Sequence, residues 1–390
     1  MQNPLHLSRR SVLAMPLVAV AAGQLASAEA AQAGGGHRST ALSIRGADLS
    51  FTPQLEAAGI RFSDRGVTRP VERILARHGA NYVRLRVWTD PPEGYSDEES
   101  ALAMAVRAKR AGMKVLLNLH YSDFWADPAH QTTPVAWQGQ DLATLADTVH
   151  DYTRRIIARF ARHGAAVDMV QIGNEVTAGM LWPVGQLYLP NGEQQWVEFT
   201  TLLKAGIAGA RAGNPRHHRL QVMVHIDRGG DNGGTRWFYD HIAEHDVAFD
   251  VIGLSFYPIW HGPLAGLKAN LDDTAVRYGK PVVVVEAAYP WTLDNGDQLE
   301  NFITTAEQLP DGAAYPATPR GQADYFEALR DVLRDTPDGR GVGFIDWSPE
   351  WIPGVGWAPG EGNPNDNLTM FDWQGRALPS VHAFRAPRRH

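Results

Sequence analysis

Two glutamates stand at the ends of apolar runs that are typical of buried β-strands. Glu175 closes the run 169–174, and Glu286 follows four consecutive valines at 282–285. Burial disfavours the ionised carboxylate and raises its pKa, and two neighbouring carboxyl groups push their pKa values apart. One group then stays protonated while the other is free to ionise. Glycoside hydrolysis requires this pair of states, one to protonate the leaving oxygen and one to act at the anomeric carbon.

A structural role is the alternative for each glutamate. Arg84 and Arg86 lie on one face of a predicted strand, because side chains alternate with a period of two. Two buried cations require nearby carboxylates, so either glutamate could serve only as an ion-pair partner. A single glutamate would favour that explanation. Two of them, at the ends of two different strands, favour catalysis.

Eight short β-rich runs alternate with helical patterns along the chain. Helical spacing is clearest at 100–111, 141–163 and 322–333, and Gly112 and Gly164 follow the first two as stop signals. The β-rich runs are 41–44, 82–88, 114–120, 169–175, 221–225, 250–255, 281–286 and 341–347. This alternation predicts parallel strands, and eight of them predict an α/β fold, a single (β/α)8 TIM barrel over residues 41–390. An open doubly wound sheet is disfavoured, because no Gly-x-Gly-x-x-Gly follows the first strand.

Polar or aromatic side chains come at the end of nearly every predicted strand. In a TIM barrel the reactive groups gather at these carboxyl ends. The sequence therefore predicts a polar cavity lined by Asp48, Arg84, Arg86, His120, Asn174, Glu175, His225, Asp227, Tyr257, Glu286 and Trp347.

The motifs around these positions resemble those of the 4/7 superfamily of retaining glycoside hydrolases. Within it, the chain is similar to glycoside hydrolase family 53, the arabinogalactan endo-β-1,4-galactanases. The resemblance covers residues 41–384, and it rests on the stretches 45–48, 83–88, 120–128, 168–175, 225–231, 253–258 and 285–291.

The resemblance implies a role for each matching residue. Glu175 is the expected acid/base and Glu286 the expected nucleophile, with β-1,4-galactan as the substrate. Arg84 should hydrogen-bond the nucleophile and keep it ionised. Asn174 should hold the sugar 2-hydroxyl, and Tyr257 should orient Glu286.

Aromatic and polar residues near the strand ends are the expected substrate-binding groups. Trp347 should form the floor beneath the sugar at the cleavage point. The remaining candidates are His120, Asp123, Trp125, His225 and Trp291. For most of them the alternative is a structural role in packing or loop capping.

Neither a metal nor a cofactor is needed for this chemistry. The chain has no cysteine, which excludes disulfides and thiol catalysis. Residues 294–297 resemble a fragment of a calcium loop, but the ligand series does not continue, so a polar turn is the better interpretation. Structural calcium is possible but not predicted, and metal ligands stay unknown.

The N-terminal segment is typical of an export signal. Arg9 and Arg10 precede an apolar run at 12–22, and Ala26-Ser27-Ala28 fits a cleavage site. We predict a twin-arginine signal peptide over 1–28, a flexible linker over 29–40, and a periplasmic or extracellular protein that leaves the membrane after cleavage. The net charge of −7 disfavours nucleic acid and anionic polymers as partners. We expect a monomer that acts on a neutral polysaccharide.

Two other functions are compatible with the same barrel. The first is another 4/7 hydrolase, such as a cellulase or a mannanase. The second is a sugar-binding protein without activity, which the presence of both glutamates disfavours.

Overall fold

The computed structural model describes residues 42–92 and 94–386 of the chain. The predicted signal peptide (1–28) and linker (29–40) lie outside the described residues, so both stay predictions. In the part that is described, no helix has both the length and the apolar character needed to cross a membrane.

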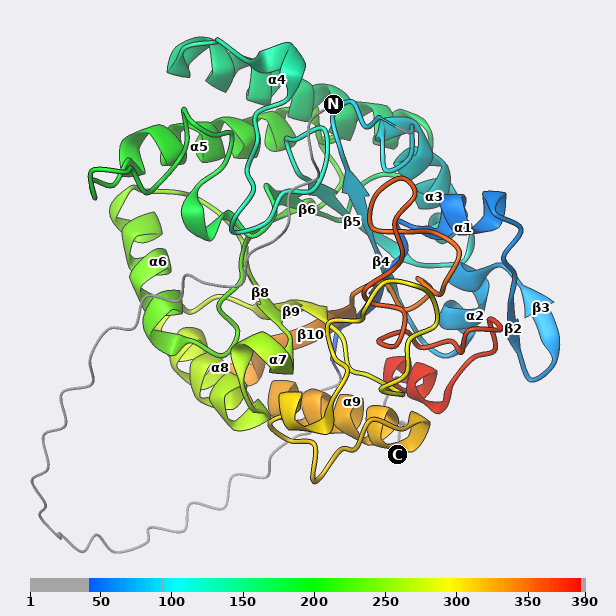
Figure 1. The fold of residues 1–390 in the computed structure, drawn as a ribbon. Coiled ribbons are helices and arrows are strands. Elements are labelled where there is room, and N and C mark those ends of the chain that lie inside the picture. Colours follow the sequence, from blue (N-terminus) through cyan, green and yellow to red (C-terminus); the bar gives the residue numbers. More distant parts are fainter. Residues whose placement is uncertain (1–41, 93, 387–390) are drawn as a thin grey trace, which may run out of the picture. The chain divides into compact units, whose positions relative to one another are not determined.

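Eight parallel strands close into a barrel, which confirms the predicted (β/α)8 fold (Figure 1). The strands follow one another around the barrel in chain order, and the last one pairs with the first. They are β1 (Ile44–Asp48), β4 (Tyr82–Val87), β5 (Lys114–Leu119), β6 (Met169–Ile172), β7 (Gln221–Ile226), β8 (Val251–Phe256), β9 (Val282–Ala287) and β10 (Gly341–Asp346).

The first strand is the one whose predicted position was wrong. It runs over Ile44–Asp48 rather than 41–44, so the charged stretch expected to follow the strand is the strand itself. Arg45 is accommodated because its guanidinium donates to backbone carbonyls, including that of Phe384 at 2.8 Å. Gly46 lies in close packing, since a Cβ there would lie 3.0 Å from the Tyr82 carbonyl oxygen and 2.3 Å from the end of the Ile345 side chain.

Helices cover the outside of the barrel (Figure 1). The predicted helices at 100–111, 141–163 and 322–333 correspond to α3, α4 and α9, which begin after the capping residues Asp97, Asp141 and Thr318. The helices are α1 (Thr52–Ala57), α2 (Val71–Arg77), α3 (Glu98–Arg110), α4 (Leu142–Arg162), α5 (Trp196–Gly213), α6 (Asn232–Glu244), α7 (Pro258–His261), α8 (Leu264–Tyr278) and α9 (Pro319–Arg334).

A small antiparallel hairpin outside the barrel was not predicted. It consists of β2 (Phe62–Asp64) and β3 (Val67–Arg69), joined by Arg65 and Gly66, which both have positive φ. Two such residues form the tight turn that suits a hairpin. The strands are too short for period-two alternation to be seen in the sequence.

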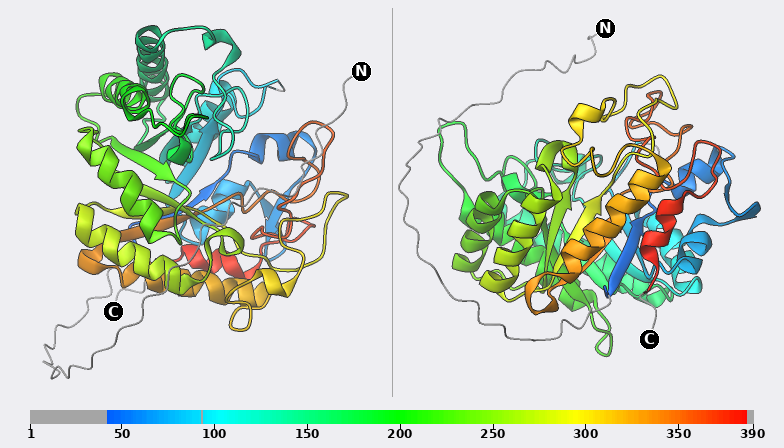
Figure 2. Two further views of the ribbon diagram at one scale, coloured as in Figure 1. Left: turned by 60° about the vertical axis from the view of Figure 1, so that its left-hand side comes forward. Right: turned by 90° about the horizontal axis from the view of Figure 1, so that it is seen from below.

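The barrel interior is apolar at one end and polar at the other. Side chains from all eight strands fill the apolar end, among them Tyr82, Leu116, Met223 and Val283. Inward residues two and four positions further along β4 are Arg84 and Arg86, at the carboxyl ends of the strands. The long loops after β9 and β10, yellow and orange in Figure 2, rise above one end of the barrel. The packed interior thus fixes the base of the polar end.

Candidate active site

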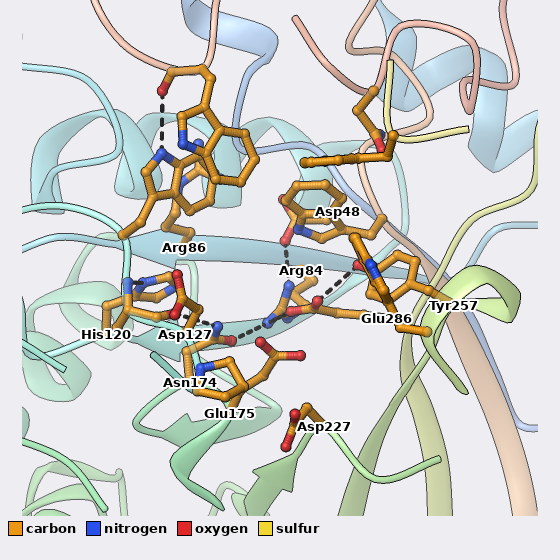
Figure 3. A pocket seen from close by; sticks show the side chains of 18 of the residues that line it. Asp48, Arg84, Arg86, His120, Asp127, Asn174, Glu175, Asp227, Tyr257 and Glu286 are labelled. Atoms are coloured by element: carbon orange, nitrogen blue, oxygen red, sulfur yellow. Dashed lines mark hydrogen bonds and ion pairs between the residues drawn. The ribbon is translucent and has the colours of Figure 1, made fainter. Parts of the chain in front are cut away.

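A cavity of about 350 Å³ opens at the carboxyl ends of the strands. Both glutamates line it, with arginines and acids at its base and aromatic rings on its walls (Figure 3). The lining side chains are those of Asp48, Arg84, Arg86, His120, Trp125, Ala126, Asp127, Pro128, Asn174, Glu175, Asp227, Tyr257, Trp260, His261, Glu286, Phe302, Trp347, Trp357 and Asn365.

Glu286 faces the cavity because strand β9 is irregular. Val283 and Val285 point into the barrel, so strict alternation would turn Glu286 outward. The pairing of β9 shifts register next to this point on both sides, with β8 and with β10. Such a bulge changes the direction of the following side chain. Here it brings Glu286 into the barrel mouth.

Arg84 holds Glu286 and Asp48 with one guanidinium. Its Nη2 donates to Glu286 Oε1 at 2.7 Å and its Nη1 to Asp48 Oδ2 at 2.8 Å. The side chain is only 1% exposed, so water does not screen these pairs. The second oxygen of Glu286 accepts a hydrogen bond of 2.9 Å from the Tyr257 hydroxyl. Both expected contacts of Glu286 are therefore present (Figure 3).

Glu175 has a different environment. It follows Gly173 (φ 74°) and is itself left-handed (φ 46°), which ends strand β6 in a sharp turn. Ser255 donates a hydrogen bond of 2.5 Å to its Oε1. In the described part of the chain no lysine or arginine forms an ion pair with Glu175. The charge that neighbours it, Asp227, is negative.

Burial and neighbouring charge separate the two glutamates. Burial raises the pKa of Glu175 well above its usual range, and the carboxylates of Glu286 and Asp227 raise it further. Burial also raises the pKa of Glu286, but Arg84 and Tyr257 lower it. We expected Arg84 to hold this pKa low; burial outweighs it. The order nevertheless follows from the contacts, with Glu175 the better proton donor and Glu286 the more readily ionised group.

One hydroxyl limits the separation of the two carboxylates. Ser255 Oγ lies 2.5 Å from Glu175 Oε1 and 3.5 Å from Glu286 Oε2. These two oxygens are therefore at most about 6 Å apart, the sum of both distances, which is below the range of about 6.5–9.5 Å typical of inverting glycosidases. A spacing of this size is compatible with direct attack by one carboxylate on a sugar bound between the two groups.

Asn174 lies between the arginine and the loop after β5. Its Oδ1 accepts from Arg84 Nη2 at 2.8 Å, and its Nδ2 donates to the Ala126 carbonyl at 2.8 Å. One hydrogen of the amide remains for a ligand. The expected contact with a sugar hydroxyl is compatible with this arrangement.

Aromatic rings form a wall on the side of β1, β5 and β10. Trp125 stacks on Trp357 with centroids 4.5 Å apart and donates Nε1 to the Trp357 carbonyl at 3.2 Å. Trp347 packs edge-on to Trp125 and to Tyr257, at 6.1 and 6.2 Å. Trp347 and Trp125 therefore lie where stacking on a sugar was predicted.

His120 also lines the cavity, as a neutral ring. Burial lowers its pKa well below the usual range, and Arg86 and Arg84 lower it further. Its Nδ1 accepts from Trp88 Nε1 at 3.3 Å and from the Ala126 N–H at 3.2 Å, so its hydrogen is on Nε2. Nε2 faces the amide of Asn118 at 3.0 Å. With both nitrogens engaged, His120 offers a ligand a ring face rather than a hydrogen bond.

Three predicted substrate-binding residues are not among those that line this cavity, and their expected roles stay predictions. Asp123 caps a loop, because its two oxygens accept from the backbone N–H groups of residues 90 and 135. His225 is fully buried beneath Glu175, where its Nε2 meets Ser255 Oγ at 2.8 Å. Trp291 packs against Trp373 and donates to Thr369 Oγ1 at 3.2 Å.

Several residues of the site were not predicted, among them Ser255 as a carboxylate partner and the aromatic rings of Trp260, Phe302 and Trp357. Ser255 is the last residue of the predicted strand 250–255, and this position at a strand end could have indicated a role in the site. Trp260 follows the same strand by five residues, and 55% of it is exposed. Phe302 and Trp357 come from the long loops after β9 and β10, where no periodic pattern indicates a position.

The turn at 294–297 supplies its own hydrogen bonds. Asp297 accepts from the backbone N–H groups of Leu299 and Asn363 at 2.8 and 2.7 Å. Asp366 accepts from the Gly296 N–H and from Asn301. Across 42–92 and 94–386, no three histidine, aspartate or glutamate side chains are arranged to hold a metal ion.

The barrel and its two carboxylates define a glycoside hydrolase. The family model for glycosyl hydrolase family 53 matches residues 44–384, and the chain belongs to this family. It is 35% identical to the arabinogalactan endo-β-1,4-galactanase of Humicola insolens, over 88% of this chain and 99% of that one. It is 43% identical to an uncharacterised protein of Niallia circulans, over 88% of this chain and 93% of that one.

Solved structures agree with this assignment. The GH53 catalytic domain of Ignisphaera aggregans superposes with a TM-score of 0.82 at 37% identity, covering 88% of this chain and 96% of that chain. A structure of a fungal β-1,4-galactanase gives a TM-score of 0.76 at 32% identity, covering 88% and 99%.

Proposed function

We propose that the protein is a retaining endo-β-1,4-galactanase that cleaves type I arabinogalactan and pectic galactan. The observation that carries the proposal is the unequal environment of the two glutamates. Glu286 has a guanidinium and a phenol as donors, whereas Glu175 has a single hydroxyl and a negative neighbour. The relatives named as β-1,4-galactanases support the choice of substrate.

In the first step, Glu286 attacks the anomeric carbon while Glu175 protonates the leaving oxygen. The glycosidic bond breaks, and the sugar becomes bonded to the Glu286 carboxyl oxygen. As the carboxylate loses its charge in this bond, Arg84 keeps Asp48 as a buried ion-pair partner, at 2.8 Å. The Arg84 guanidinium therefore keeps an ion-pair partner in both steps.

In the second step, Glu175 acts as a base. It removes a proton from water, the water oxygen attacks the anomeric carbon, and Glu286 leaves as a carboxylate. Two inversions at one carbon give retention. Trp347 supports the sugar from below, and the free hydrogen of the Asn174 amide binds its 2-hydroxyl.

The chemistry needs no metal ion and no cofactor. We further propose that the enzyme works in the periplasm or outside the cell, because paired arginines precede an apolar run in the N-terminal segment. We also propose that it works as a monomer. An acidic chain of net charge −7 suits an uncharged polymer better than an anionic one.

A substrate panel tests this function. Purified enzyme is incubated with unbranched β-1,4-galactan, β-mannan, cellulose and xylan, and the new reducing ends are measured. We expect release from galactan alone, as oligosaccharides of several lengths. Cleavage of mannan or cellulose, with no cleavage of galactan, would assign the protein to another activity of the 4/7 superfamily. No cleavage of any polymer, combined with binding to one, would favour a sugar-binding protein.

A further inference from the structure

Two aromatic side chains that do not line the cavity, Tyr188 and Trp237, stack on each other. Tyr188 belongs to the loop between β6 and α5, and 43% of it is exposed. Its ring stacks on that of Trp237 in α6, with centroids 5.9 Å apart and planes inclined by 15°. Trp237 in turn packs on Trp196 of α5, at 5.2 Å. The Tyr188 ring is thus supported by Trp237 and remains partly exposed to solvent.

Charged groups connect this pair to the cavity. Asp227 lines the cavity, accepts a hydrogen bond from Thr177 at 2.5 Å, and lies 3.7 Å from the Arg228 guanidinium. The backbone brings Tyr188 near the same place, because the N–H of the preceding residue, Leu187, donates to the Ala178 carbonyl at 3.0 Å. Ala178 directly follows Thr177, so the segment that carries Tyr188 lies next to the Thr177–Asp227 contact at the cavity wall.

The position of Asp227 relative to Glu175 indicates which part of the substrate lies on this side of the cavity. Figure 3 shows Asp227 beyond Glu175, on the side away from Asp48 and Arg86. A general acid lies next to the leaving oxygen, so the leaving part of a polysaccharide passes on its side. The mechanism uses neither Tyr188 nor Arg228.

We infer that Tyr188, supported by Trp237, is a stacking platform for a sugar unit of the leaving part of the galactan chain, beyond the unit next to the cleaved bond, with Arg228 as a hydrogen-bond donor to that part. The inference rests on the proposed function. A flat ring fixed by a second ring costs little entropy when a sugar binds to it. Arg228 is 39% exposed at its side chain, so its N–H groups are accessible to hydroxyl groups.

The test determines which bond of an oligosaccharide substrate is cut. A β-1,4-galactohexaose labelled at its reducing end is digested by the wild type, by Tyr188→Leu and by Tyr188→Phe, and the labelled products are sized by mass spectrometry. The leaving part carries the label. We expect Tyr188→Leu to give shorter labelled products, while Tyr188→Phe, which keeps the flat ring, cuts as the wild type does. Leucine keeps an apolar contact with Trp237, and equal melting temperatures would exclude misfolding as a cause.

Binding supplies an independent measurement. In a Glu286→Gln background, which prevents turnover, Tyr188→Leu should weaken binding of the hexaose about fivefold, the factor that corresponds to about 1 kcal/mol. Binding of a galactobiose should not change. An unchanged cleavage pattern and unchanged affinity for the hexaose would overturn the inference and leave the proposed function intact. Failure of the parent proteins to cleave or bind any galactan would overturn both.

Discussion

Removing the hydroxyl of Tyr257 should narrow the pH range of activity from the acidic side. In Tyr257→Phe, Glu286 Oε2 loses the donor that lies at 2.9 Å, and the ring contacts with Trp347 and Trp260 remain. The lost hydrogen bond stabilised the ionised form of Glu286 and lowered its pKa. A hydrogen bond to a charged group contributes about 1.5–3 kcal/mol, and one pKa unit corresponds to about 1.4 kcal/mol. The pKa of Glu286 should therefore rise by about 1–2 units.

The sign of the effect follows from the state required for catalysis. Activity needs Glu286 ionised and Glu175 protonated, so it falls at low pH as Glu286 takes up a proton. A higher pKa of Glu286 moves this acidic limb of the kcat/KM profile to higher pH. The assay is the initial rate on soluble galactan at low substrate concentration, measured across the pH range.

Ser255→Ala is the matched control. Ser255 donates to Glu175 at 2.5 Å and lowers the pKa of that carboxyl, so its removal should move the alkaline limb to higher pH. The acidic limb should move less, because the same hydroxyl lies 3.5 Å from Glu286 Oε2. Because the two carboxyl groups interact, the limbs report the pair, and the comparison of the two variants assigns them. An unchanged acidic limb in Tyr257→Phe, or a shift of its alkaline limb alone, would refute the assigned roles.

Three further predictions concern charge and stability. Glu175→Ala should lose activity on galactan but form the glycosyl-enzyme from an aryl galactoside whose leaving group needs no proton, seen as a phenol burst; a burst in Glu286→Ala instead would exchange the two roles. Arg84→Met leaves Asp48 and Glu286 without their buried cation and should lower the free energy of unfolding by about 3–5 kcal/mol in urea titrations, whereas a loss below about 1 kcal/mol would contradict it. Burial raises the pKa of Glu350 to about 8 from a usual 4.5, so its share of stability is present below pH 4.5 and is lost as the pH rises through 8. The melting temperature of Glu350→Gln should therefore fall less between pH 5 and pH 8 than that of the wild type. An equal fall in both proteins would contradict Glu350 as the source of this pH dependence.

The barrel could be predicted from the sequence because its strands are short, apolar and regularly spaced. Seven of the eight runs lie within a few residues of the observed strands. The first strand was displaced because Arg45 and Asp48 looked like loop residues. Their partners, the Phe384 carbonyl and Arg84, are distant in the sequence and become visible only when the barrel closes.

The acidic and cationic centre of the site could be predicted for the same reason. Arg84, Asn174 and Glu175 follow from strand position alone, since strand ends meet at one edge. The orientation of Glu286 could not, because it depends on a bulge that reverses the alternation of β9. No local pattern in the four valines before it indicates that irregularity.

The aromatic walls were the least predictable part. Trp125 and Trp291 look alike in sequence, each following a strand end in a loop. Trp125 meets Trp357 from a distant loop and lines the cavity, whereas Trp291 meets Trp373 and is not among the lining residues. The choice between these outcomes is made by loop packing, which sequence periodicity does not encode.

The stereochemistry of the first product tests the central claim most directly. Proton NMR recorded immediately after enzyme is added to unbranched β-1,4-galactan distinguishes the anomers before mutarotation mixes them. Carboxylates that share one hydroxyl, as Glu175 and Glu286 share Ser255 Oγ, predict that the β-anomer appears first. An α-anomer as the first product would show inversion and contradict the proposed covalent intermediate on Glu286.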